Sequence, residues 1–176
     1  MGKKQLKIYK KIPGGSEKKW EFDVWAEGVQ SWIASVVGAK VKGITETTLR
    51  FLKLEIETGM KEGETIPEIA LRVQNLWDMF SERRSIVIAR TEVISASNAG
   101  SFFGAKQTGL PLQKEWLATQ DKRVRDTHKK VDGQIREMDE PFNIGRGKLM
   151  FPGDSSLGAP KEETIQCRCT QVYVVK

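Results

Sequence analysis

The chain has 176 residues, of which 39% are hydrophobic and 30% are charged, and its formal net charge is +6. This composition is ordinary for a folded protein and argues against wholesale disorder. No apolar run approaches the roughly 18 residues of a membrane span, so no membrane partner is expected. The basic start MGKKQLKIYKK leads into PGGSEKK and not into an apolar stretch, which argues against a signal peptide. With two cysteines and no export signal, the sequence predicts a protein of a reducing cytoplasm.

The first 42 residues carry most of the net charge, with nine lysines against four acidic residues. We expect residues 1–15 to form a flexible basic arm that contacts the phosphates of double-stranded DNA with salt-sensitive affinity. The lysines of this arm are Lys3, Lys4, Lys7, Lys10 and Lys11. The alternative is a solvated terminus whose lysines only keep the protein soluble.

Residues 16–104 form a predicted helical region, because their apolar side chains recur at spacings of three and four. The strongest local signal is a capping box, in which Thr65 caps a helix and Glu68 follows three residues later. We expect about four amphipathic helices, over residues 16–37, 45–58, 65–80 and 81 or 85 to 103.

From residue 105 the pattern becomes mixed and predicts a small α+β module over residues 105–176. β-branched and aromatic residues mark its C-terminal strand, and Gly133 suits the end of a helix. The fold class is therefore α+β, with a helical region followed by a module that has a short C-terminal sheet. The expected elements of the module are a strand at 114–118, a helix from Thr119 or Asp121 to Gly133, a long connection at 134–166 and a strand at 172–175.

The only histidine and the only two cysteines of the chain fall in two short segments of this module. If the last strand begins as early as Cys167, the thiols of Cys167 and Cys169 project from one face. Two thiolates and one imidazole are ligands that zinc prefers, so His128 joins them as a candidate zinc ligand. Asp132, Asp121 or a water would complete the site. The expected helix also carries a polar seam at i, i+4, i+7 and i+11, formed by Asp121, Arg125, His128 and Asp132.

Two alternatives to zinc remain open. Both cysteines could be reduced and packed, with His128 hydrogen-bonded to a carbonyl or to Asp132. In the second alternative, His128 activates one of the two thiols as a nucleophile, although the sequence shows no oxyanion-hole signature. A disulfide between Cys167 and Cys169 is disfavoured, because its small ring would be strained in an extended strand.

The same residues carry a resemblance to a known family. The string WLATQDKRVRDTHKKVDG at 116–133 is followed by DEPF, PGD, GAP and CRC, and IARTEV precedes it at 88–93. In their order and spacing these pieces resemble the phage Mu protein F family, whose members are minor head or head morphogenesis proteins of tailed phages. The resemblance covers roughly residues 65–172. Many relatives have cysteines where this chain has Arg125 and His128, and many have Asn where it has Gln166.

This resemblance implies a noncatalytic structural component of a phage or prophage head, which binds portal or major capsid subunits. Its expected location is the virion head and, during assembly, the host cytoplasm. Some proteins of this family also carry ADP-ribosyltransferase domains, and Arg90 invites that interpretation here. The order of the elements disagrees, since Glu55 and Glu57 precede Arg90. The alternative function is a metal-dependent or thiol enzyme, an ADP-ribosyltransferase- or nuclease-like effector associated with the head.

Overall fold

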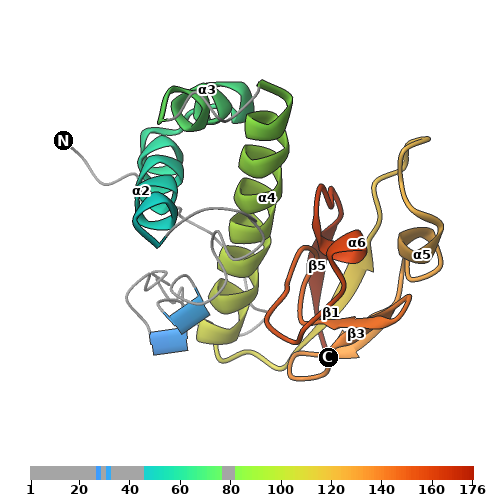
Figure 1. Cartoon of the computed structure of the whole chain (residues 1–176). Coiled ribbons are helices and arrows are strands. Elements are labelled where there is room, and N and C mark those ends of the chain that lie inside the picture. The colour runs from blue at the N-terminus through green and yellow to red at the C-terminus, as the bar shows by residue number, and fades with distance from the viewer. Residues whose placement is uncertain (1–26, 29–30, 33–45, 77–81) are drawn as a thin grey trace.

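The computed structural model describes residues 27–28, 31–32, 46–76 and 82–176. Within these ranges three longer helices come first, and a module of short strands and one-turn helices follows. Figure 1 shows this module beside α4, on the side away from α2. The predicted α+β class is confirmed. The basic arm with its five lysines, and most of the helix expected at 16–37, lie outside the described residues. The three longer helices are α2 (Glu46–Glu62), α3 (Ile66–Leu76) and α4 (Glu82–Gln107).

These three helices confirm three of the four expected ones, with later ends for α2 and α4. Helix α2 continues through Gly59, where an added Cβ would lie 2.6 Å from Cγ1 of Ile69, so the small residue allows α3 to pack closely. Gly63, with φ 75°, supplies the left-handed residue that ends α2. Helix α4 runs on to Gln107, so the expected boundary after residue 104 lies within its last turn. The division into arm, helical region and module stays a prediction.

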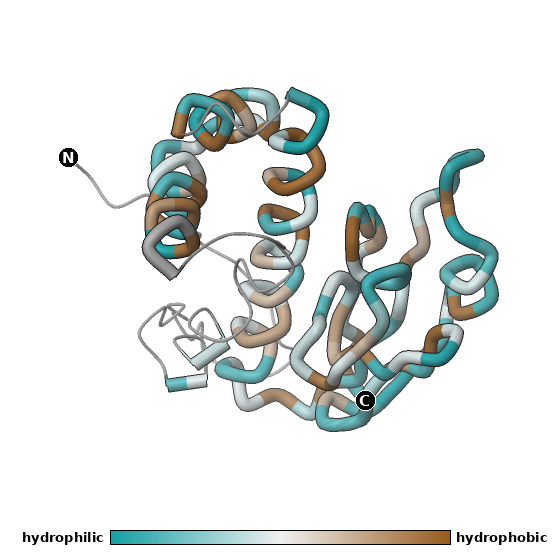
Figure 2. Tube along the Cα trace, viewed as in Figure 1, coloured by the Kyte–Doolittle hydropathy of each residue, from teal (hydrophilic) through white to brown (hydrophobic). Residues whose placement is uncertain are grey.

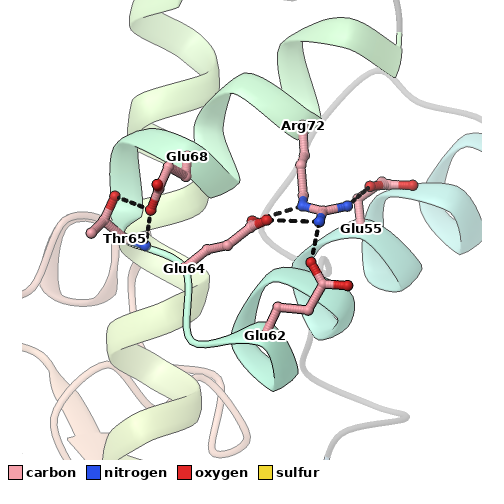
Figure 3. A network of polar contacts seen from close by, with 6 residues as sticks. All are labelled: Glu55, Glu62, Glu64, Thr65, Glu68 and Arg72. Carbon is pink, nitrogen blue, oxygen red and sulfur yellow. Dashed lines mark hydrogen bonds and ion pairs between the residues drawn. The ribbon is translucent and has the colours of Figure 1, made fainter.

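Charged side chains hold the turn between α2 and α3 (Figure 3). Glu68 accepts hydrogen bonds from the backbone N–H and the hydroxyl of Thr65, both at 2.6 Å, which is the glutamate half of the predicted capping box. Arg72 of α3 reaches back over the turn to the carboxylates of Glu55, Glu62 and Glu64. The hydrogen bond from Arg72 lowers the pKa of Glu64. This network therefore fixes the angle at which α3 leaves α2.

The helices bury a first hydrophobic core between them. Helix α3 packs against both α2 and α4, and each helix in Figure 2 carries brown and teal residues, as amphipathic helices do. Among the helices described, none combines the length and the apolar character that crossing a bilayer requires. The buried residues of this core are Leu52, Ile56, Ile69, Ala70, Val73, Ile88 and Ala89.

The module contains a three-stranded antiparallel sheet in the order β2-β1-β5 and a separate hairpin, β3-β4. Residues 134–166, expected as one long connection with little periodicity, hold β2, this hairpin and α6, so the prediction of a long loop is wrong. The reason is length, because strands of three residues and a helix of four leave no readable periodicity. The elements are β1 (Leu112–Leu117), α5 (Asp126–Lys129), β2 (Ile135–Glu137), β3 (Phe142–Ile144), β4 (Gly147–Leu149), α6 (Lys161–Thr164) and β5 (Thr170–Val175).

The inner face of β1 carries a fully buried lysine. Nζ of Lys114 donates hydrogen bonds to the carbonyl oxygens of Met138, at 3.2 Å, and Met150, at 2.8 Å. The same ammonium lies 4.9 Å from the ring centroid of Phe102 and 5.2 Å from that of Phe142. Burial lowers the pKa of Lys114 to about 8, although nearby carboxylates oppose the shift. Lys114 thus joins α4 to both sheets.

We expect the free energy of unfolding to rise by about 1 kcal/mol more between pH 7 and pH 9 in the wild type than in Lys114→Met. The pKa of Lys114 is about 8 in the folded protein and near 10.5 when unfolded, so over this range the unfolded chain binds more protons. Stability therefore rises with pH. Urea unfolding at a series of pH values measures the slope, and Lys148→Met, at an exposed lysine, should keep the wild-type slope. Equal slopes for Lys114→Met and wild type would contradict the prediction.

A polar stripe on α4 joins this helix to the module. Asn98 donates from Nδ2 to the carbonyl oxygens of Pro152 and Cys169, both at 3.0 Å. Its Oδ1 accepts the hydroxyl of Thr170 at 3.1 Å, and Ser95, one turn earlier, donates to the carbonyl of Gly153 at 2.8 Å. These bonds place the segment that contains the two cysteines directly against α4.

Candidate metal centre

The helix predicted from Thr119 or Asp121 to Gly133 is wrong, because only Asp126–Lys129 is helical there, as α5. Asp121 turns the chain instead, since its carboxylate accepts the N–H of Arg123 at 2.8 Å, a local bond that competes with helix formation. Gly133, with φ 72°, directs the chain into β2. Helix α5 is therefore a single turn, and it places His128 in the interior of the module.

The predicted polar seam does not form as a helical stripe, since two of its members bind the C-terminal segment instead. The carboxylate of Asp121 pairs with both terminal nitrogens of the Arg168 guanidinium, one of them at 2.8 Å. The hydrogen bond from Arg168 holds the pKa of Asp121 well below its usual range. Arg125 donates to the carbonyl oxygen of Ile165 at 2.5 Å. Asp121 and Arg125 thus hold the loop before α5 against residues 165–168.

Neither aspartate predicted as a fourth ligand belongs to the group that could hold a metal. The two oxygens of Asp132 accept hydrogen bonds from the N–H of Ala118, at 2.7 Å, and from Nε2 of Gln120, at 2.8 Å. Asp121 is engaged by Arg168. Both carboxylates therefore stabilise the conformation of the loop that follows β1.

His128, Cys167 and Cys169 do come together, as the sequence indicates. Nδ1 of His128 lies 3.3 Å from Sγ of Cys169 and 3.8 Å from Sγ of Cys167, and the three ligand atoms lie within 4.8 Å of one another. The strand argument that predicted this was wrong, because β5 begins at Thr170, after both cysteines. The thiols converge because the chain turns at Gln166, whose φ is 55°.

The donor set and its spacing fit a zinc ion. With the bond lengths that zinc makes to sulfur and nitrogen, ligand atoms of a tetrahedral site lie about 3.5 to 3.8 Å apart. The observed separations of 3.3 and 3.8 Å are close to these values. The three side chains are 1% to 3% exposed, so the site is closed to solvent. These residues can thus hold a soft or borderline metal ion with small adjustments.

A buried glutamate that the sequence analysis did not identify completes the surroundings of His128. Oε2 of Glu163 lies 3.0 Å from Nε2 of His128, on the ring edge away from the sulfurs, and accepts the hydroxyl of Thr127 at 2.8 Å. Trp116 packs edge-on against the imidazole, with ring centroids 5.5 Å apart. Pro160 followed by two glutamates is a helix-start signal that could have located α6, but nothing in the pattern shows which glutamate points inward.

The two thiols shift each other's pKa in opposite directions. The hydrogen bond from the Cys167 thiol lowers the pKa of Cys169 to about 4, although burial opposes the shift. The hydrogen bond to Cys169, together with burial, raises the pKa of Cys167 well above its usual value. A thiolate next to an imidazole is the protonation state from which a metal is bound or a nucleophile acts.

The position of the thiols favours metal binding over catalysis. Cys169 is 3% exposed and Cys167 is 2% exposed, so neither sulfur meets a substrate at the surface. An open hollow beside the loop after β1 is lined by residues such as Thr119, Lys122 and Lys129, and none of the three potential ligands lines it. Cys169 contacts His128, which contacts Glu163, as a nucleophile, a base and an orienting carboxylate do in a catalytic triad. The likeness is limited to this chain of contacts.

We expect Gln166→Asn to stabilise the protein by about 0.5 kcal/mol and Gln166→Val to destabilise it by about 1 to 2 kcal/mol. Gln166 has φ 55°, a region that Asn adopts readily and a β-branched residue does not. Its N–H donates to the hydroxyl of Thr91 at 3.0 Å, which neither change removes. Urea unfolding of the wild type and the two variants measures the order of their free energies of unfolding. Equal stability of the Asn and Val variants would show that this backbone conformation is not maintained.

Comparison with known proteins places the whole site inside the region that a family profile matches. The profile of a family described as "Phage Mu protein F like protein" matches residues 51–172, which include α3, α4 and the His128, Cys167 and Cys169 group. No solved structure matches the chain.

Three relatives each align over 68% to 70% of the chain. NAD(+)–arginine ADP-ribosyltransferase EFV of Enterococcus faecalis (strain ATCC 700802 / V583) is 37% identical over 123 residues, 68% of this chain and 24% of that protein. Minor head protein GP7 of Bacillus phage SPP1 is 32% identical over 127 residues, 70% of this chain and 40% of that protein. Uncharacterized protein YqbB of Bacillus subtilis (strain 168) is 28% identical over 124 residues. The chain therefore spans 24% to 40% of the length of these relatives.

Proposed function

Because the chain belongs to the phage Mu protein F-like family, we propose that it is a noncatalytic structural component of the head of a tailed phage or prophage. The observation that carries this proposal is the family match over residues 51–172. Its relative in phage SPP1 is by name a minor head protein. The protein would act in the virion head and, during assembly, in the cytoplasm of the host.

The alternative of an enzyme rests on one relative and on the thiol group. The relative named as an arginine ADP-ribosyltransferase is matched over 24% of its length, so its activity is a property of that longer protein. The thiol alternative requires access to Cys169, which is 3% exposed. Both points favour the structural role.

The buried group would hold one zinc ion as a structural centre. Nδ1 of His128 and the sulfurs of Cys167 and Cys169 are the protein ligands that the spacing supports. Bound zinc would tie α5 to the segment before β5 and so add folding free energy to a module with a small core. The identity of the metal is part of the proposal.

The partner surface is the outer face of the helical region, which would dock on portal or major capsid subunits. Phe51 and Leu54 of α2 are 41% and 55% exposed, and Leu71 of α3 is 56% exposed. Phe51 and Leu54 also line a shallow hollow on α2. Neighbouring exposed apolar side chains such as Phe51 and Leu54 are typical of protein–protein contacts.

Co-sedimentation with portal rings and capsid subunits from the same phage or prophage genome tests this proposal. The wild type should sediment with one of them at low salt. Leu54→Asp should weaken that association, whereas Val174→Asp, at an exposed valine of β5, should leave it unchanged. Absence of association with either partner at low salt would refute the structural role.

The basic arm would add contacts to packaged DNA. Deletion of residues 1–15 removes Lys3, Lys4, Lys7, Lys10 and Lys11. If each neutralises one phosphate, the slope of the logarithm of the binding constant against the logarithm of salt concentration should fall in magnitude by about 4.5. Fluorescence anisotropy with duplex DNA at several salt concentrations measures this slope. An unchanged slope would mean that the lysines only solvate the terminus.

A further inference from the structure

The imidazole of His128 has contacts at both ring nitrogens, with sulfur atoms at one and a carboxylate oxygen at the other. Nδ1 faces the sulfurs of Cys169 and Cys167, at 3.3 and 3.8 Å. Nε2 faces Oε2 of Glu163 at 3.0 Å. When Nε2 carries the ring proton and donates it to the carboxylate of Glu163, the neutral imidazole has its lone pair on Nδ1, the atom that faces the two sulfurs.

The carboxylate of Glu163 is itself fixed from two sides. Its Oε2 accepts the hydroxyl of Thr127, the residue before His128, at 2.8 Å. Its Oε1 lies where a Cβ on Gly145 would come within 2.3 Å, so the glycine in the β3-β4 turn leaves the space that the carboxylate occupies. Glu163 is 8% exposed and therefore has little freedom to move away from the imidazole.

We propose that Glu163 is the positioning residue of the metal centre, which selects the His128 tautomer that binds metal through Nδ1. This inference rests on the proposed zinc site. A carboxylate behind a ligating histidine fixes the ring orientation and raises the basicity of the ligand nitrogen. Thr127 and Gly145 set the position of Glu163, so the elements α5, α6 and the β3-β4 hairpin all contribute to one ligand.

Zinc affinity of the full chain, measured by competition with a chromophoric chelator, tests this role. Glu163→Gln keeps the shape of the side chain and removes its charge, and it should weaken zinc binding 10- to 100-fold. Thr127→Val removes the hydroxyl that holds the carboxylate of Glu163 and should weaken zinc binding by a smaller factor. Glu162→Gln changes the exposed neighbour on α6 and should leave the affinity at the wild-type value.

A spectroscopic measurement on the wild type gives a second test that needs no variant. The chain has one histidine, so ¹⁵N-histidine labelling yields the two ring resonances of His128 without ambiguity. In the zinc-loaded protein Nδ1 should be bound to metal and Nε2 should carry a proton. Zinc bound through Nε2, or equal affinities of wild type and Glu163→Gln, would overturn the role of Glu163 while the metal centre stands. A wild-type chain that binds no zinc would overturn the metal centre itself and this inference with it.

Discussion

Replacing Cys169 with serine is expected to abolish stoichiometric zinc binding and to lower the midpoint of thermal unfolding by roughly 10 °C or more. Structural zinc contributes on the order of 10 kcal/mol to small modules, and a loss of even about 4 kcal/mol moves the midpoint of a chain of this size by that amount. Sulfur of Cys169 lies 3.3 Å from Nδ1 of His128, and a serine hydroxyl is a much weaker zinc ligand.

Chelation separates the loss of metal from the loss of packing. Stripping zinc from the wild type should lower its midpoint nearly to that of Cys169→Ser, and the same chelator should leave the variant unchanged. Differential scanning calorimetry of the four samples gives all the values. If the variant is destabilised while chelation has no effect on the wild type, the two cysteines are packed side chains and hold no metal.

Asn98→Ala should lower the free energy of unfolding by about 2 to 4 kcal/mol, because it leaves two buried carbonyl oxygens without their donor. Nδ2 of Asn98 serves Pro152 and Cys169, and the residue is 4% exposed. The hydrogen bonds that are lost are those that join α4 to the module. Urea unfolding, with the slope compared between variants, measures it.

Two further substitutions test the specificity of this effect. Asn98→Asp keeps the oxygen that accepts the Thr170 hydroxyl but loses the donor, so it should be at least as harmful as alanine. Ser97→Ala, at the exposed neighbour, should change stability by less than about 0.5 kcal/mol. An Asn98→Ala variant within that same margin of wild type would mean that the junction does not depend on this amide.

The helical region could be predicted because α2 and α4 are long and because α2 and α3 are amphipathic, whereas the buried side of α4 is largely polar. Helices α2 and α4 have 17 and 26 residues, so the helical spacing repeats over several turns. The pair of Thr65 and Glu68 marks the start of α3. Local signals and packing agree there, as they do in most folded proteins. The junction through Asn98 was not predicted, because its partners are backbone carbonyls more than 50 residues away in sequence.

The module was harder to predict because contacts distant in sequence decide its local structure. The polar spacing of residues 121–132 is compatible with a helix, but Asp121 and Arg125 are bound to residues 165–168 instead. Tertiary bonds of this kind override weak propensity in a short segment. The strands β2, β3 and β4 have three residues each, too few for alternation to be recognised.

The candidate site could be predicted in its residue types and not in its geometry. His128, Cys167 and Cys169 stood out because the chain has one histidine and two cysteines. The structure brings them together through a turn at Gln166, not through a shared strand face. Glu163 escaped notice because a glutamate in an apparently unstructured connection is usually a solvated side chain. Its contact with Nε2 of His128 depends on the tertiary structure, which the pattern of residues does not indicate.

The metal content of the purified, tag-free protein decides whether the buried His128, Cys167 and Cys169 group is a structural metal centre. Elemental mass spectrometry should find one zinc per wild-type chain and none in a Cys167→Ser, Cys169→Ser double variant. Protein purified without chelator and dialysed against trace zinc, yet free of metal, would contradict the claim. The three side chains would then be a hydrogen-bonded part of the hydrophobic core.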